Sequence, residues 1–249
     1  INIIMSCFYD IKCKNDSEII NRTFDGKGNN LYEPLNGSVG VNMLRLSTIE
    51  CNTDLSQITP TPREISNKIC DNNGIDITNK TNMTNMFWVW GQFLDHEIVL
   101  IHTNKNDPSN MQTPPDDAYP GREIPFNRSN FELDNSGKRR QQNSLSSFID
   151  ATNVYGYNSD RAFKLRKLDG TGKLKTLNSD NGEIIPIFNT CELENAPNND
   201  SSYFVCGDIR SNENLYLLSL HTLFIREHNR LCDNICQKNP CLKGQDELI

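Results

Sequence analysis

The sequence predicts a mainly α-helical protein with long loops and few, short strands. In the stretch that begins near residue 211, apolar residues recur at helical spacing at Leu217, Leu220, Phe224 and Leu231. A second apolar stretch, 82–102, is interrupted by acids and histidine and is typical of a buried helix. Strand signals are rare, and clusters of Gly, Pro, Asn and Asp separate the helices.

The remaining segments follow from their turn signals. Residues 1–60 are loop-rich, and 103–144 form a polar, irregular excursion. In the next segment, SDRAFKLRKL predicts a helix capped by Ser159 or Asp160. Residues 170–208 are again turn-rich, and loops of this length usually carry function or disulfides.

Composition excludes several classes of function. A chain of 249 residues builds one sizeable core or two small ones. The net charge of −7, spread over dispersed acids, argues against a nucleic-acid-binding surface. No apolar run reaches membrane-spanning length. The first residues lack the basic and apolar pattern of a signal peptide, so we expect that a signal has already been removed.

Cysteines and glycosylation sequons predict a secreted glycoprotein. Nine cysteines are many for a cytosolic chain of this size. Each sequon alone is weak, because an Asn-rich chain produces them by chance. Together with the cysteines they favour an extracellular or lumenal compartment; they start at Asn15, Asn21, Asn36, Asn79, Asn82, Asn127 and Asn199.

The stretch WGQFLDHEI, residues 90–98, concentrates polar chemistry on a predicted helix. Gln92, Asp95 and His96 are spaced i, i+3, i+4 and share one face, whereas Glu97 is rotated about a quarter turn away. A helical zinc site is excluded, because His102 follows His96 by six residues instead of four. From spacing alone, a polar cavity and a hydrogen-bonded core histidine are equally good interpretations.

Five blocks in one order resemble the animal-type haem peroxidases of the peroxidase–cyclooxygenase superfamily. The blocks are NRTFDGKGNNLYEPLNGSVGVNMLRL at 21–46, WGQFLDHEI at 90–98, SLSSFIDATNVYG at 144–156, GDIR at 207–210 and LHTLFIREHNRL at 220–231. The resemblance covers about 22–249 and implies the animal haem peroxidase fold. It reaches only the N-terminal part of the family's catalytic domain, so residues 1–249 are expected to be one portion of a single domain.

The resemblance implies a role for each distal residue. His96 matches the distal base, which takes a proton from hydrogen peroxide and returns it to the leaving oxygen; a neutral imidazole suits this task. Gln92 matches a glutamine that orients distal water or halide. Arg210 matches an arginine that stabilises charge on the departing oxygen. Read alone, Arg210 is equally a surface arginine in a salt bridge.

The resemblance also implies a haem b cofactor, with two carboxylates that can form esters to it. Asp95 matches the first and Glu213 the second, although Glu213 by itself is also typical of a solvated acid in the first turn of a helix. The family's third link falls at Asn214, which is not a methionine. The strongly shifted haem electronics of the chloride-oxidising mammalian member are therefore not expected.

A calcium site is implied next to the distal helix. In the family the acid after the distal histidine binds calcium together with a downstream loop, which matches SLSSFIDAT. Hard oxygen ligands with two carboxylates suit calcium. The implied ligands are Glu97, Ser146, the carbonyl of Phe148, Asp150 and Thr152. The family usually has Asp at the position of Glu97, and without calcium Asp150 and Ser146 are interpreted as turn and cap residues.

No histidine of this chain matches the family's proximal ligand. His96, His102, His221 and His228 are the four histidines. We interpret His221 and His228 as parts of a buried polar network, with His228 as haem ligand the sharper alternative. A second polypeptide that carries the proximal ligand is therefore the expected partner, and a true truncation is the competing interpretation.

Cysteine pairing is only partly predicted. The resemblance implies a Cys191–Cys206 disulfide before GDIR, and Cys51–Cys70 and Cys7–Cys13 are possible local bridges. A cluster near the end has no predicted pairing, and one of its thiols is a candidate for a bond to the second polypeptide; it comprises Cys232, Cys236 and Cys241.

Taken together, the residues and the resemblance predict a secreted haem peroxidase that consumes hydrogen peroxide and oxidises halides, thiocyanate or phenolic donors. The first alternative is a haem-free adhesion or interaction module on a degenerate peroxidase fold. The retention of Gln92, His96 and Arg210 argues against it. A cyclooxygenase-like fatty-acid oxygenase is a further alternative, for which no membrane-binding helices are identified.

Overall fold

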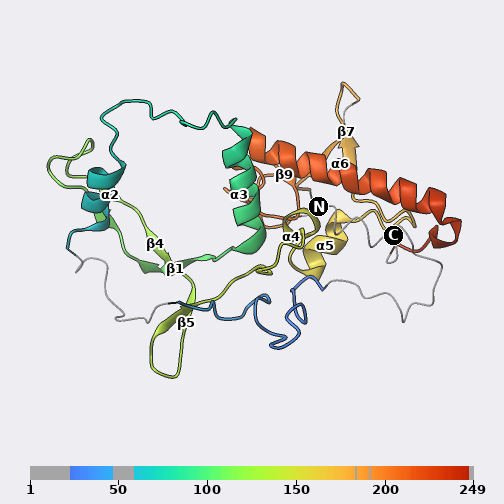
Figure 1. Ribbon diagram of the computed structural model, residues 1–249, viewed down its shortest axis with the longest axis horizontal. Coiled ribbons are helices and arrows are strands. Elements are labelled where there is room, and N and C mark those ends of the chain that lie inside the picture. Colours follow the sequence, from blue (N-terminus) through green and yellow to red (C-terminus); the bar gives the residue numbers. More distant parts are fainter. Residues whose placement is uncertain (1–22, 47–58, 183, 191, 247–249) are drawn as a thin grey trace.

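A computed structural model describes residues 23–46, 59–182, 184–190 and 192–246. Two helices dominate it: α3, Met86–Ile98, and α6, Leu215–Lys238. They pack against each other, and the short helix α4, Thr152–Tyr155, contacts both (Figure 1). The predicted mainly helical fold with few, short strands is confirmed.

The core lies where these three helices meet. Phe93 of α3 stacks on Phe224 of α6, with ring centroids 5.0 Å apart. The cluster also includes side chains from the loops that follow α4 and precede α6; its buried members are Val89, Phe93, Val154, Leu165, Leu174, Leu193, Val205, Cys206, Leu217, Leu220 and Ile225. Removing this apolar surface from water is the main force that fixes α3 against α6.

Helix ends differ from the predicted ones for local reasons. Helix α3 is shorter than 82–102, because the backbone turns extended at Val99. Helix α6 starts after Asn214, whose side chain accepts a hydrogen bond from the amide of Leu217. Helix α5, Ser159–Leu165, is capped by Asn158. The predicted cap at Ser159 or Asp160 is therefore wrong by one residue or more.

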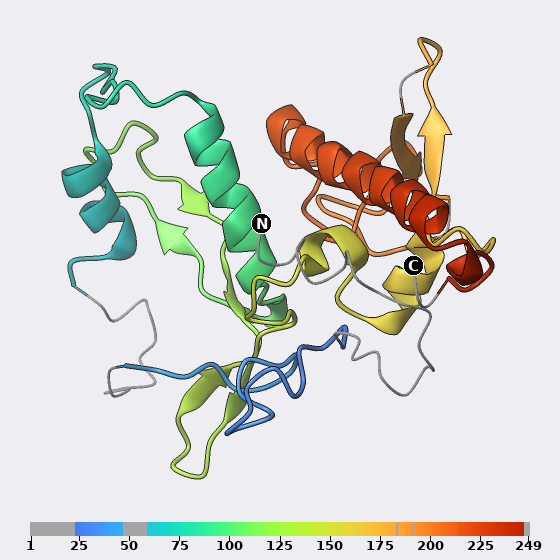
Figure 2. The same cartoon turned by 45° about the vertical axis from the view of Figure 1, so that its right-hand side comes forward.

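The predicted irregular excursion contains short antiparallel strand pairs, which lie on the side of α3 away from α6 (Figure 2). Helix α2, Pro62–Cys70, lies in the same region and begins with a capping box between Thr61 and Glu64. The pairs are β1 (Thr103–Pro108) with β4 (Asn127–Ser129), β2 (Met111–Gln112) with β3 (Glu123–Ile124), and β5 (Phe131–Leu133) with β6 (Arg139–Gln141).

The turn-rich segment before α6 holds the one three-stranded sheet among the described residues. Its order is β7 (Thr176–Asn178), β8 (Ile184–Phe188) and β9 (Phe204–Val205). After α6 the chain forms a 3₁₀ turn, η3, at Pro240–Leu242. No helix of the described segments combines the length and the apolar character needed to cross a bilayer.

The segment 23–46 packs on the loop that was predicted to bind calcium. A Cβ on Gly37 would lie 2.9 Å from the ring of Phe148, and one on Gly26 would lie 2.6 Å from the Ser146 hydroxyl. Both glycines also have positive φ, so any side chain would be strained as well as crowded. The conformation of the loop thus depends on residues more than 100 positions earlier in the chain.

Two predicted disulfides are wrong in this structure. Cys206 and Cys70 both carry free thiols, so neither the Cys191–Cys206 nor the Cys51–Cys70 bridge is formed. Cys206 is fully buried in the core, where it packs as a small apolar side chain. The predicted Cys7–Cys13 bridge lies outside the described residues. Of the C-terminal cluster, Cys232 and Cys236 are free and Cys241 is disulfide-bonded.

Candidate functional site

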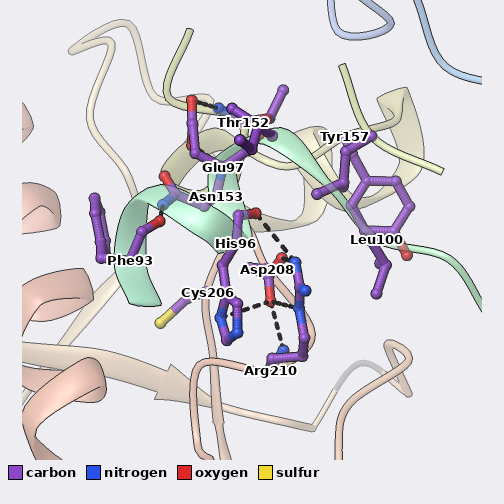
Figure 3. A network of polar contacts seen from close by, with 12 residues as sticks. Phe93, His96, Glu97, Leu100, Thr152, Asn153, Tyr157, Cys206, Asp208 and Arg210 are labelled. Carbon is purple, nitrogen blue, oxygen red and sulfur yellow. Dashed lines mark hydrogen bonds and ion pairs between the residues drawn. The ribbon is translucent and has the colours of Figure 1, made fainter. Parts of the chain in front are cut away.

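Helix α3 divides its polar side chains between two surroundings (Figure 3). Gln92 and His96 point toward the segment that precedes α6, where both contact Glu213. Glu97 points the other way, into the loop at 150–153. The quarter-turn separation predicted from the sequence is therefore realised as two distinct sites on one helix.

His96 is buried, with 5% of its surface exposed. Its Nε2 atom lies 3.7 Å from Glu213 Oε2, and its Nδ1 atom lies 3.9 Å from Asp208 Oδ1. Burial and the nearby positive charge of Arg210 lower the pKa of His96 below its ordinary value. The imidazole is therefore neutral at neutral pH, which is the form able to accept a proton.

Gln92 is held in place between two residues of the segment before α6. Its Nε2 donates to Glu213 Oε2 at 2.8 Å, and its Oε1 accepts from Asn214 Nδ2 at 3.0 Å. The Glu213 carboxylate thus contacts both Gln92 and His96. The Glu213 side chain is 41% exposed, and Asp95 is exposed as well. The structure therefore leaves both carboxylates predicted to link haem accessible.

Arg210 lies beside His96 but is engaged by a neighbour that the sequence analysis did not single out. Its Nε and Nη2 donate to the two oxygens of Asp208 at 2.9 and 2.8 Å, and Nη2 also donates to the carbonyl of His96 at 3.1 Å. Arg210 thus fixes the end of α3 that carries His96. The alternative interpretation of Arg210, an arginine in a salt bridge, is thus also met, but the salt bridge is with Asp208 and is buried close to His96.

Asp208 and Arg161 are the site residues that sequence reasoning missed. Asp208 has no exposed side-chain surface, and although burial opposes ionisation, Arg210 holds the pKa of Asp208 below its ordinary value. Arg161 is 2% exposed and donates to the carbonyls of Cys206 and Glu194 at 2.8 and 2.7 Å. The GDIR motif itself was the available signal for Asp208, whereas nothing local marks Arg161.

Glu97 is anchored by backbone amides. Its Oε1 accepts from the amides of Asp150 and Thr152 at 2.8 and 3.0 Å, and its Oε2 accepts from the amide of Asn153 at 3.1 Å. Burial, with a contribution from the charge of Asp150, raises the pKa of Glu97 to about 7. The Ser146 hydroxyl donates to Asp150 Oδ2 at 2.7 Å. Four of the five predicted calcium ligands therefore gather at one place.

The chemistry of this donor set fits calcium. All the gathered donors are oxygens, and two of the groups are the carboxylates of Glu97 and Asp150, which suits calcium. A divalent cation beside them would favour the ionised form. Within the described residues no three His, Cys, Asp or Glu side chains gather as a metal site, so hydroxyl and carbonyl oxygens would complete the shell.

The residues around His96 also fit one face of a haem. A buried neutral base, a fixed amide and two accessible carboxylates lie on α3 and the segment before α6. These are the groups that a distal site needs: a proton acceptor, an orienting donor and carboxylates able to reach a porphyrin edge.

The other three histidines differ in their surroundings. His228 contacts the Tyr155 hydroxyl at 3.2 Å and the Gly172 carbonyl at 2.9 Å, which fits the predicted structural role. His221 is fully buried, and neither of its ring nitrogens has a hydrogen-bond partner among the described residues. The predicted polar network is thus present for His228 and incomplete for His221. His102 is 32% exposed and lies 3.6 Å from Glu194.

Comparison with known proteins agrees with this geometry. The family model described as animal haem peroxidase matches residues 21–247. Peroxinectin A of Dictyostelium discoideum is 33% identical over 92% of this chain and 46% of its own length. Mouse myeloperoxidase is 35% identical over 75% of this chain and 30% of its own length. The chain therefore spans less than half the length of these relatives.

Two solved structures also superpose on this chain. Peroxidase A from Dictyostelium discoideum superposes with a TM-score of 0.78 at 29% identity, covering 92% of this chain and 50% of that one. A fatty acid alpha-dioxygenase from Oryza sativa superposes with a TM-score of 0.70 at 25% identity, covering 94% of this chain and 36% of that one.

Proposed function

Because the chain belongs to the animal haem peroxidase family, we propose that it forms the distal part of a haem peroxidase catalytic domain. The proposed enzyme reduces hydrogen peroxide and oxidises small donors such as halides, thiocyanate or phenols. The observation that carries this proposal is His96, a buried imidazole with lowered pKa whose Nε2 faces the polar group of Gln92 and Glu213.

In this mechanism His96 moves one proton. Its Nε2 accepts a proton from hydrogen peroxide and then gives it to the leaving oxygen, which departs as water, so the imidazole is unchanged at the end. Bound haem would supply the two electrons that cleave the O–O bond. Gln92 orients the peroxide or a water, and the Arg210 charge stabilises the departing oxygen.

Haem would be held against α3 by Asp95 and Glu213. Both carboxylates are accessible, as ester formation requires, although Glu213 hydrogen-bonds Gln92 in the present arrangement. Calcium would be held by Glu97, Ser146, Phe148, Asp150 and Thr152, where it would brace the helix that carries His96. We further propose that the protein is secreted, on the basis of its cysteines and sequons.

A second polypeptide segment is proposed to supply the proximal haem ligand. Large apolar side chains are exposed at the N-terminal ends of α3 and α6, where Trp88 and Tyr216 meet edge to face at 6.2 Å. Exposed apolar groups in contact with one another are typical of a surface that another part of the protein covers. The set comprises Phe87, Trp88, Leu215 and Tyr216, and Leu223 is exposed further along α6.

The first test is an absorption spectrum of the native protein, together with reducing and non-reducing gels. A Soret band and a second polypeptide support the proposal. A single chain of this length without a Soret band refutes it and favours a haem-free interaction module.

The second test addresses His96 directly. The variant His96→Ala is expected to slow the reaction with hydrogen peroxide by about 10²–10⁴-fold, the usual contribution of a general base. Stopped-flow mixing that finds an unchanged rate constant would remove His96 from the mechanism. His102→Ala, at a partly exposed histidine on another part of the fold, is the matched control and is expected to leave the rate unchanged.

A further inference from the structure

A buried carboxylate lies behind His96, opposite the side that faces Gln92 and Glu213. Asp208 has no exposed side-chain surface, and its Oδ1 atom is 3.9 Å from His96 Nδ1 (Figure 3). No described residue makes a hydrogen bond to that Nδ1 atom, although it is buried. A buried nitrogen that lacks a partner is costly, and a carboxylate is the nearest acidic group to it.

The position of Asp208 is fixed by its own backbone contacts. Its amide donates to the carbonyl of Asn153 at 2.9 Å, and the buried guanidinium of Arg161 contacts its carbonyl at 3.4 Å. Gly207, the preceding residue, approaches α4 so closely that a Cβ there would lie 2.5 Å from the carbonyl carbon of Val154. The carboxylate is therefore held next to the histidine by rigid elements.

The charge state of Asp208 is fixed as well. Arg210 donates to both carboxylate oxygens, and the Arg210 amide donates to Oδ1 at 2.7 Å. Three charge-assisted hydrogen bonds keep the group ionised and leave it acting only as an acceptor. An acceptor of this kind favours a proton on the neighbouring ring nitrogen.

Other buried polar atoms of the described residues that lack partners lie on α4 and α6, the two helices that contact α3. Both ring nitrogens of His221 and the Oδ1 atom of Asn153 lack hydrogen-bond partners within the described segments. The charges of Asp208 and His96 both act on the pKa of His221. Buried water commonly satisfies such atoms, and one water at this place would also span the 3.9 Å between His96 and Asp208.

We propose that Asp208 is the positioning residue of His96, and that its carboxylate receives the Nδ1–H either directly or through one water shared with His221. Asp208 thereby fixes the tautomer in which Nε2 is bare and faces the peroxide side. The proposal rests on the proposed peroxidase function. Asp208 touches no substrate in this scheme and acts only through His96.

The variant Asp208→Asn tests the role, because the amide keeps the size of the side chain but can donate to Nδ1 and so favour the wrong tautomer. We expect the rate constant for hydrogen peroxide to fall by about 10²-fold, as loss of a correctly oriented base requires. The KM for the reducing donor is expected to change less than about twofold, because binding of the donor does not use His96. Asp160→Asn, at a side chain that is 68% exposed, is the matched control.

A spectroscopic measurement on the unaltered protein covers the case in which Asp208→Asn fails to fold. Histidine ¹⁵N chemical shifts, recorded on the full protein in its diamagnetic ferrous carbonyl form or as isolated if it holds no haem, report the tautomer of His96. A His96 ring protonated at Nδ1 supports the proposal. Protonation at Nε2, or an Asp208→Asn variant with an unchanged peroxide rate, overturns it.

The two proposals fail in different ways. If the native protein lacks a Soret band but His96 is protonated at Nδ1, the peroxidase function fails and the Asp208 contact stands. If the protein reacts with peroxide but His96 carries its proton on Nε2, the peroxidase function stands and the positioning role fails.

Discussion

The approach of Gly207 to helix α4 predicts a large effect of adding a single methyl group. The backbone of Gly207 does not have positive φ, so alanine is sterically free to adopt it. The obstacle is space: an alanine Cβ would lie 2.5 Å from the carbonyl carbon of Val154 and 2.6 Å from the carbonyl oxygen of Asn153. Both atoms belong to the backbone, so no side chain can rotate away.

The expected loss of stability follows from how far the loop must move to relieve this contact. Non-bonded carbon atoms prefer a separation of about 3.5 Å, so the loop must move about 1 Å from α4. Such a shift stretches the hydrogen bond from the Asp208 amide to the Asn153 carbonyl. We expect Gly207→Ala to lower the free energy of unfolding by about 3 kcal/mol, the upper end of the range for overpacking.

Catalytic function is expected to suffer as well, because the same loop carries Asp208 and Arg210. A displacement of about 1 Å in a positioning group commonly lowers a rate by about 10²-fold. Urea unfolding followed by circular dichroism measures the first effect, and stopped-flow mixing with peroxide measures the second.

The matched control is Gly91→Ala in helix α3, where a Cβ would meet nothing within 4 Å. Alanine in a helix interior stabilises by up to about 1 kcal/mol relative to glycine, so this variant is expected to unfold at the same or a higher urea concentration. A Gly207→Ala protein that unfolds at the same urea concentration as the parent would refute the reasoning.

Two further predictions concern pH and calcium. Burial lowers the pKa of His221 to about 4, so the folded protein holds this histidine neutral. The unfolded chain binds a proton there below a pKa near 6.5. The free energy of unfolding is therefore unaffected above pH 6.5 and falls by about 3 kcal/mol as pH drops toward 4. Urea unfolding at pH 7 and at pH 4.5 measures this loss, which His221→Phe should reduce and His102→Phe should not; equal pH dependence of all three proteins would contradict it. For the calcium site, a chelator is expected to lower the stability of the parent by about 2–3 kcal/mol, if calcium was present at about 100 times its Kd. Glu97→Gln should abolish that response in thermal unfolding, and a parent whose melting temperature ignores both chelator and added calcium would rule the site out.

Local sequence determined the two long helices and the split of polar groups on α3. Helical spacing places Gln92 and His96 on one side and Glu97 on another, whatever the helix packs against. The resemblance of the ordered blocks to a family identified the fold, which the comparisons confirm. Helix ends differ from the predicted ones, because capping depends on single hydrogen bonds such as that of Asn158.

Only the tertiary structure decided what surrounds His96. Asp208 lies 112 positions after His96, and Arg161 is buried against carbonyls 33 and 45 positions away, so no periodicity or local motif reveals these contacts. The disulfide predictions failed for the same reason, because the burial of Cys206 depends on how distant segments pack. The sequence alone determined which residues could do the chemistry, because side-chain type and helical spacing are local properties. The tertiary structure decided which of them meet, because burial, pKa and hydrogen bonding depend on segments that are far apart in the chain.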